Sequence, residues 1–454
     1  MPIKVGRHPI VLVALVLAAV FALPCATYAT NQPVVIFHAF DQHYHDIEKF
    51  VCEVSEQGYS HIQIAPAQKS NPDPKWWARY QPVDYSVIEG RGSEQELRNL
   101  ILKAHGCNVK VIADVVFNHM ADMEQYRDLS FPQFTSQDFH SRCGINYEDG
   151  ERGSEINCWL GSLPDLDSSK PNVQNIHKAY IKKLLDLGID GFRLDAAKHM
   201  QAEVVQTYID YINYASHGNA WSYLEVITDH DTQAGDYNYI AAVTDFVLYD
   251  SMKQAFSYGG DLRWLRVPRA IGDPRSVTFG RNHDTIEELN PGHAIKPYSD
   301  PSDSYLATAY VLARESGTPL VLNWDNADIP YIKHGVKFRR MMQQRKEEGK
   351  NVKENVLAAV DSPTVLLMER GSEGFFVVNK GVDVYDVRVL DMTLTNIDGC
   401  YRELRSNFTV AVERRSNGKK YVTRWGTWAR GGMEIHGRDA LYFVRDSWSQ
   451  CLPM

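Results

Sequence analysis

Four ionisable side chains lie close together in the stretch "DGFRLDAAKHM", which runs from position 190 to 200. Arg193, Asp195, Lys198 and His199 stand at the end of the apolar run "IDGFRL", which has the character of a strand. Arg193 and Asp195 are two residues apart, so on a strand their side chains point to the same face. There the guanidinium can hold the carboxylate ionised and aimed, as a nucleophile requires.

The elements that must position these residues are visible as eight short apolar runs, each followed by polar or acidic residues. They are "VVIF" (34–37), "HIQIAP" (61–66), "VKVIADVVF" (109–117), "GFRLD" (191–195), "SYLEVI" (222–227), "VTDFVLYD" (243–250), "SVTFGRNHD" (276–284) and "PLVLNWD" (319–325). Helical patterns lie between several of them, such as "SEQELRNLILKAHG", in which Ser93 and Glu96 form a capping box. Alternating strands and helices predict parallel pairing, and eight repeats predict an α/β fold with a (β/α)₈ barrel.

Acidic residues stand at the C-terminal ends of four of these runs: Asp114, Asp195, Glu225 and Asp284. In a barrel of parallel strands these ends open on one face, and that face carries the active site. Taken singly, each acid fits a solvated loop residue or a helix cap. Four carboxylates at one mouth would repel one another unless they were used, and His119, His199 and His283 lie beside them. The combination predicts a catalytic site.

Two departures from the alternating pattern indicate further domains. The connection from Asn118 to Gly188 is too long for one helix, so residues 119–167 are predicted to form a small inserted domain. From residue 356 to 454 the runs alternate as in antiparallel strands, which predicts a C-terminal β-sandwich. The barrel would then comprise residues 30–118 and 168–355.

The N-terminus has the pattern of a secretory signal peptide over residues 1–29, with cleavage expected after Ala29. Basic residues precede a continuous apolar run from Pro9 to Leu23. A transmembrane anchor is the alternative, but the run is shorter than the roughly 20 residues that a spanning helix needs. We therefore expect a secreted, extracellular protein with no membrane contact after cleavage.

The mature chain keeps six cysteines: Cys52, Cys107, Cys143, Cys158, Cys400 and Cys451. An even number without any CxxC pair favours disulfides over metal thiolates in an exported protein. Six cysteines allow fifteen pairings. Proximity along the chain suggests Cys143 with Cys158 and Cys400 with Cys451, and Cys52 with Cys107 would follow by elimination.

The overall charge and the aromatic content bear on partners. The net charge of -9 shows no basic patch for nucleic acid. The chain has 9 Trp and 24 Tyr, and aromatic faces suit the apolar faces of sugar rings, although most such residues are core residues.

Ordered motifs give the chain a resemblance to a known family. "DVVFNH" (114–119), "GFRLDAAKH" (191–199), the Glu of "YLEVI" (223–227) and "RNHD" (281–284) resemble the four sequence motifs of the α-amylase family of glycoside hydrolases. "WWARYQPVDY" (76–85) and "LPDLD" (163–167) also resemble family segments. The resemblance implies that Asp195 is the nucleophile, Glu225 the general acid/base and Asp284 the acid that stabilises the transition state. Negative charge from Asp195 and Asp284 is expected to raise the pKa of Glu225.

The resemblance also implies a set of substrate-binding residues. They are Trp76, Trp77, Tyr80, Gln81, His119, Arg193, Lys198, His199 and His283. Within this set, Trp77 and Tyr80 would stack on glucose rings, and His119 and His283 would donate hydrogen bonds to sugar hydroxyls. A tryptophan pair more often means core packing, and a lone histidine is more often structural, but the matched motifs reverse these odds.

The same resemblance raises the question of two ion sites, one for Ca²⁺ and one for chloride. It implies a Ca²⁺ site made by Asn118 and Asp165 with the backbone carbonyls of His199 and of a residue near Ile156, and mixed oxygen ligands suit this cation. Some family members bind chloride through two residues that match Arg193 and Asn282 and a third, basic residue. That third position falls at Leu320, which cannot hold an anion, so we expect weak or no chloride binding.

The expected activity is endo-hydrolysis of α-1,4-glucosidic bonds in starch, glycogen and maltooligosaccharides with retention. A maltooligosaccharide-forming exo-amylase or transglycosylase of the same superfamily is one alternative, and a non-catalytic glycan-binding protein on the same barrel is another. We expect a monomer whose partner is an α-glucan.

Overall fold

The structure is a computed structural model that describes residues 32–148, 150, 152–272, 275–286, 295, 302–325, 329–357, 361–425 and 434–451. The predicted signal peptide, residues 1–29, lies outside these described residues. Within the described ranges, no helix is both long enough and apolar enough to cross a membrane.

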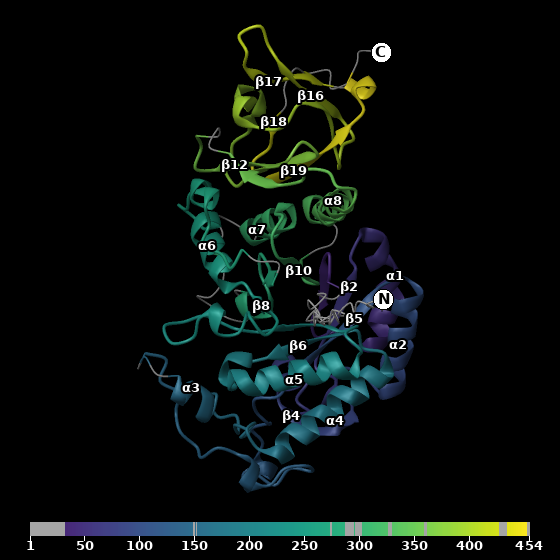
Figure 1. The fold of residues 1–454 in the computed structure, drawn as a ribbon, viewed down its shortest axis with the longest axis vertical. Helices are drawn as coiled ribbons and strands as arrows, with labels where there is room; N and C mark the ends of the chain where they lie inside the picture. Colours follow the sequence, from purple (N-terminus) through teal and green to yellow (C-terminus); the bar gives the residue numbers. More distant parts are fainter. Residues whose placement is uncertain are drawn as a thin grey trace, which may run out of the picture.

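Eight parallel strands close into a barrel in the order β1-β10-β9-β8-β7-β6-β5-β2. They are β1 (Ile36–Ala39), β2 (His61–Ile64), β5 (Lys110–Val116), β6 (Gly191–Asp195), β7 (Trp221–Leu224), β8 (Ala242–Thr244), β9 (Ser276–Thr278) and β10 (Thr318–Leu322). Helices surround the strands: α1 (Tyr44–Gln57), α2 (Glu94–Gly106), α4 (Pro171–Leu187), α5 (Ala202–Ala215), α6 (Phe246–Phe256), α7 (Ser302–Ala313) and α8 (Pro330–Glu347). The predicted (β/α)₈ barrel is confirmed (Figure 1).

Local sequence explains where these elements begin. Helix α2 begins after Ser93, whose side chain accepts a hydrogen bond from the Glu96 N–H, and the expected capping box is present. Its Leu97, Leu100 and Ile101 are buried, as the 3.6-residue period predicts.

One predicted strand is wrong over most of its length. The run 243–250 was expected to be extended, but the strand β8 ends at Thr244 and helix α6 begins at Phe246. The side chain of Asp245 accepts a hydrogen bond from the Leu248 N–H, so it caps the helix. A buried apolar run gives no period that separates strand from helix, and the cap decides the outcome.

The segment between β5 and α4 leaves the barrel and returns. It contains the short helix α3 (Gly153–Asn157) and few regular elements, and it lies at the opposite end of the molecule from the C-terminal sheet (Figure 1). The Cys143–Cys158 disulfide crosses it. A second excursion, from β2 to α2, forms the hairpin of β3 (Gln68–Ser70) and β4 (Pro82–Ile88) with the 3₁₀ turn Trp76–Tyr80.

The C-terminal part is antiparallel, as predicted. Seven strands pair in the order β11-β12-β13-β19-β15-β16-β17, and β14 (Tyr385–Asp386) pairs with β18 (Glu434–Ile435). The seven are β11 (Glu354–Val356), β12 (Val365–Arg370), β13 (Gly374–Asn379), β15 (Gly399–Glu403), β16 (Thr409–Arg414), β17 (Lys420–Trp425) and β19 (Asp439–Asp446). The sheet packs on α7 and α8 (Figure 1), where the Tyr442 hydroxyl donates to the Ala309 carbonyl at 3.0 Å.

All three suggested disulfides are confirmed. They join Cys52 to Cys107, Cys143 to Cys158 and Cys400 to Cys451. The first connects α1 to the end of α2, and the third fastens the C-terminal segment to β15.

Candidate active site

A cavity of about 510 Å³ opens at the C-terminal ends of the barrel strands. Its lining includes every predicted catalytic and substrate-binding residue except Arg193: Trp76, Trp77, Tyr80, Gln81, His119, Asp195, Lys198, His199, Glu225, His283 and Asp284. These residues come from the β2–α2 excursion and from the ends of β5, β6, β7 and β9. The barrel therefore brings together side chains that are distant in sequence.

Arg193 lies beneath the cavity and holds three carboxylates. Its Nη1 contacts both oxygens of Asp114 at 2.7 Å and Oδ1 of Asp195 at 2.9 Å. Its Nη2 donates to Oε1 of Glu225, and the Ala196 N–H donates to the other Glu225 oxygen at 2.9 Å. The carboxylates of Asp195 and Glu225 thus lie on the two terminal nitrogens of one guanidinium.

The cluster holds more acids than bases, and this changes their proton affinities. Burial, and then the charge of Glu225, raise the pKa of both Asp195 and Asp284 well above the usual range for a carboxyl. Burial also raises the pKa of Asp114 to about 6, although Arg193 opposes the rise. A cluster of this composition therefore binds protons more tightly than separate, solvated carboxylates do.

The pKa expected for Glu225 is wrong in direction. Burial is the largest single influence, and it raises this pKa. The charge of Arg193 opposes burial, and together with smaller contributions from His283 and the Ala196 N–H it lowers the net pKa. Asp284 shares a hydrogen bond with Glu225, and its own pKa is the one that rises. Arg193 contacts Glu225 as well as Asp195, and this second contact was not expected from the sequence.

Aromatic rings form one wall of the cavity. The rings of Tyr80 and His283 stack with centroids 5.4 Å apart, and Phe40 stacks on the same His283 at 4.9 Å. The Tyr80 hydroxyl donates to Asp114 at 3.0 Å, so this ring is fixed at both ends. The His119 Nε2–H donates to the Tyr80 carbonyl at 2.9 Å, which occupies a donor that was expected to face a sugar.

Five lining residues were not anticipated: Tyr147, Leu160, Leu163, Ala196 and Ile227. The first three lie in the segment between β5 and α4. The Tyr147 ring lies 4.9 Å from Nζ of Lys198 and is 38% exposed. Nothing in the local sequence of Tyr147 marks it, because the fold alone brings this segment over the barrel mouth.

The predicted calcium ligands lie at the junction of that segment with the barrel. His119 and Asp165 form an isolated β-bridge, and the Leu166 N–H donates to the Asn118 carbonyl at 2.9 Å. Asp165 accepts from His140 Nδ1 at 2.6 Å through one oxygen, while its buried Oδ1 has no hydrogen-bond partner among the described residues. Burial raises the pKa of Asp165 to about 6. A buried carboxylate oxygen without a partner, next to an amide, fits the oxygen ligands that Ca²⁺ takes.

The other two predicted ligands approach from α3 and from the end of β6. His199 Nδ1 lies 3.0 Å from the carbonyl of Glu155, the residue before Ile156. This contact ties the 3₁₀ turn Ala197–His199 to α3.

The two polar residues considered for chloride already contact acidic residues. Arg193 is surrounded by three carboxylates, and the side-chain oxygen of Asn282 accepts the Asp284 N–H at 3.1 Å. Leu320 is buried in β10. Arg314, the nearest alternative cation in sequence, pairs with Glu354 at 3.3 Å.

Comparison with known proteins finds a family whose description matches part of this chain. The description "Alpha amylase, catalytic domain" matches residues 54–245. A curated alpha-amylase from Phaedon cochleariae is 30% identical over 318 residues, which cover 63% of this chain and 64% of that protein. The middle of the chain therefore resembles the catalytic domain of the α-amylase family.

A second relative and two solved structures are also similar to this chain. An alpha-amylase-related protein from Drosophila ercepeae is 30% identical over 319 residues, so the chain spans 64% of the length of these first two curated relatives. A mutant alpha-amylase I from Eisenia fetida, in complex with maltohexaose, superimposes with a TM-score of 0.75 at 20% identity and covers 92% of this chain and 99% of its own. An alpha-amylase from Geobacillus thermoleovorans, complexed with acarbose, gives a TM-score of 0.68 at 18% identity. The match covers 91% of this chain and 98% of that protein's chain.

Proposed function

We propose that this protein is a glycoside hydrolase that cleaves internal α-1,4-glucosidic bonds of starch, glycogen and maltooligosaccharides with retention of configuration. The observation that carries the proposal is the arrangement of Asp195 and Glu225 on one guanidinium, with Asp284 hydrogen-bonded to Glu225. A retaining glycosidase needs two carboxyl groups roughly 5–5.5 Å apart. Two carboxylates held by one arginine agree with so short a separation.

In the first step, Asp195 attacks the anomeric carbon while Glu225 gives its proton to the leaving glucosidic oxygen. The C–O bond to the leaving sugar breaks, and an ester bond to Asp195 forms. In the second step, Glu225 takes a proton from water, the oxygen of that water attacks the same carbon, and Asp195 leaves. Each step inverts the anomeric carbon, so the product keeps the original configuration.

The proton for the first step comes from the coupled pair of Glu225 and Asp284. The raised pKa of Asp284 and its hydrogen bond to Glu225 keep one proton within the pair at neutral pH. A sugar oxygen that approaches Glu225 can then receive this proton, and Asp284 is left ionised beside the positively charged transition state. Arg193 opposes the rise in the pKa of Asp195 that burial and the charge of Glu225 cause, and so favours the ionised nucleophile.

The proposed substrate-binding residues divide into a flat aromatic wall and a polar side. Trp76, Trp77 and Tyr80 form the first, with Gln81 next to Tyr80 in the chain, and stacking on aromatic faces suits glucose rings. His119, His199, His283 and Lys198 offer ring nitrogens and an ammonium. Maltohexaose and acarbose in the related structures support an oligosaccharide substrate.

We also propose that Asn118 and Asp165, with carbonyls of His199 and of a residue near Ile156, hold Ca²⁺. When bound, the ion supplies a charge that stabilises the junction between the inserted segment and the barrel. The three disulfides and the predicted signal peptide support secretion into an oxidising environment. We propose that the protein acts as a monomer.

Chromatography of the products from soluble starch tests the proposal. Endo-hydrolysis gives a mixture of maltooligosaccharides early in the reaction, whereas exo-action gives one product length from the start. Asp195→Asn and Glu225→Gln should each fold and lose several orders of magnitude in activity. Near-normal turnover by either purified variant would refute the role given to that residue.

A further inference from the structure

Four charged side chains join α3 to the segments that follow β6 and β7. Lys198 Nζ lies 3.1 Å from Oε1 of Glu155 and also contacts Oδ2 of Asp229. Arg152 Nε lies 3.7 Å from the other oxygen of Glu155. The two cations balance the two anions, so the cluster carries no net charge.

The cluster connects the ends of the two strands that carry the proposed nucleophile and acid. Lys198 is three residues after Asp195, and Asp229 is four residues after Glu225. The backbone reinforces this link, because the Ala197 N–H donates to the Glu225 carbonyl at 3.1 Å. The Lys198–Asp229 contact therefore joins the two loops that follow these strands, beyond the catalytic residues.

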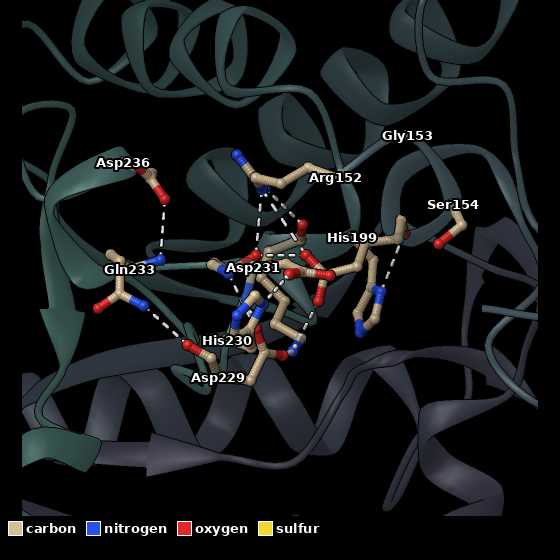
Figure 2. Close-up of polar contacts among 12 residues, drawn as sticks. Arg152, Gly153, Ser154, His199, Asp229, His230, Asp231, Gln233 and Asp236 are labelled. Carbon is tan, nitrogen blue, oxygen red and sulfur yellow. Dashed lines mark hydrogen bonds and ion pairs between the residues drawn. The ribbon is translucent and has the colours of Figure 1, made fainter. Parts of the chain in front are cut away.

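Further hydrogen bonds hold each charged group in place (Figure 2). Arg152 donates to the Lys198 carbonyl at 3.0 Å and to Oγ1 of Thr232 at 3.1 Å, and the Thr232 hydroxyl in turn donates to Glu155. The N–H of Thr232 donates to Asp229 Oδ1 at 2.8 Å. Asp229 is thus fixed through one oxygen by the backbone and through the other by Lys198.

Burial makes these contacts consequential. The Glu155 side chain is fully buried and that of Lys198 is 8% exposed, so removing either partner leaves a charge without compensation. Lys198 also lines the cavity on the side of Tyr147 and Ile227. An ammonium has three N–H donors. Two of them meet Glu155 and Asp229, which leaves one for a ligand in the cavity.

We propose that Glu155 and Asp229 are positioning residues that hold the two sides of the Lys198 ammonium. They couple the inserted segment to the strand ends that carry Asp195 and Glu225, and they direct the remaining Lys198 donor to sugar units on the leaving-group side. The proposal rests on the proposed function, because it assigns these residues to substrate that extends beyond the cleavage point.

Two substrates and the variants Asp229→Asn and Glu155→Gln test this role. Maltoheptaose places glucose units on the leaving-group side, whereas an aryl maltotrioside with an acidic phenol places none there. In both variants we expect kcat/KM for maltoheptaose to fall about tenfold or more, because a small displacement of a group that positions the substrate has an effect of this size. The rate on the aryl substrate should change little, and Lys198→Arg should retain more maltoheptaose activity than Lys198→Met.

A double-mutant cycle in denaturant unfolding provides a second readout that does not depend on activity. Lys198→Met and Asp229→Asn should be non-additive, whereas the exposed pair Lys182 and Asp186 on α4, 2.5 Å apart, should show little coupling in the matched cycle. Additive effects at Lys198 and Asp229, or equal losses on both substrates, would overturn the proposal. A wild-type protein that cleaves neither substrate contradicts the proposed function. The unfolding cycle still decides whether Lys198 and Asp229 interact.

Discussion

Replacement of Arg193 by Met should move the acid limb of the activity profile to higher pH. The guanidinium is 3% exposed and touches Asp114, Asp195 and Glu225 at hydrogen-bonding distance. Removing a cation from beside a carboxylate raises the pKa of that carboxylate. The nucleophile must be ionised, so activity should be lost at low pH and regained only as the pH rises through the new, higher pKa.

The size of this shift follows from the geometry. A unit charge about 4 Å away, at an effective dielectric constant near 20, is worth about 4 kcal/mol, or roughly three pH units. Three carboxylates share the lost charge and can retain a proton between them, so we expect a displacement of at least about one unit. Arg193→Lys keeps the charge but not the two-nitrogen contact, and it should shift the limb less.

The assay is kcat/KM for an aryl maltotrioside as a function of pH, with the unfolding free energy measured in parallel. Breaking a buried ion pair costs about 3–5 kcal/mol, but proton uptake by the carboxylates should reduce this cost. An acid limb of the Met variant that coincides with that of the wild type would refute the electrostatic role of Arg193.

Three further predictions concern ions and acid stability. A chelator should lower the melting temperature and Ca²⁺ should restore it, whereas Asp165→Ala should lose this response; a variant that responds like the wild type contradicts the site. Activity should be nearly equal in sodium chloride and sodium acetate at the same ionic strength, because Leu320 supplies no charge beside Arg193; chloride-dependent turnover would show that another cation takes its place. Burial lowers the pKa of His177 to about 3, so the unfolded state binds its proton first as the pH falls below 6.5. As the pH falls below 6.5, the unfolding free energy of the wild type should therefore decrease by up to about 1.4 kcal/mol per pH unit more than that of His177→Gln. Equal pH dependence of the unfolding free energy in the two proteins would contradict this.

Much of the architecture was predictable because it depends on periodic patterns. The eight apolar runs, the capping box at Ser93 and the alternating C-terminal strands all express local rules that sequence displays. The predicted strand over residues 243–250 was wrong because Asp245 caps a helix within a mainly apolar run. Cysteine spacing suggested the disulfides because two of the three close short or terminal segments.

The site was predictable in its residue types but not in its contacts. Ordered motifs identified the carboxylates, since their spacing reflects strand ends that meet at one mouth. The position of Arg193 between Asp195 and Glu225, and hence the lowered pKa of Glu225, depends on side-chain geometry that no motif contains. Tyr147 and Glu155 were missed because they lie in an irregular segment that only the fold brings to the cavity.

The central claim is a retaining double displacement by Asp195 and Glu225, and the anomeric form of the first product tests it most directly. Proton NMR during the first minutes of maltoheptaose hydrolysis, before mutarotation, distinguishes the two anomers of the new reducing end. We predict that the α-anomer appears first, and that Asp195→Asn abolishes its formation under the same conditions. Initial appearance of the β-anomer, or an unchanged rate in the Asp195→Asn protein, would contradict the mechanism.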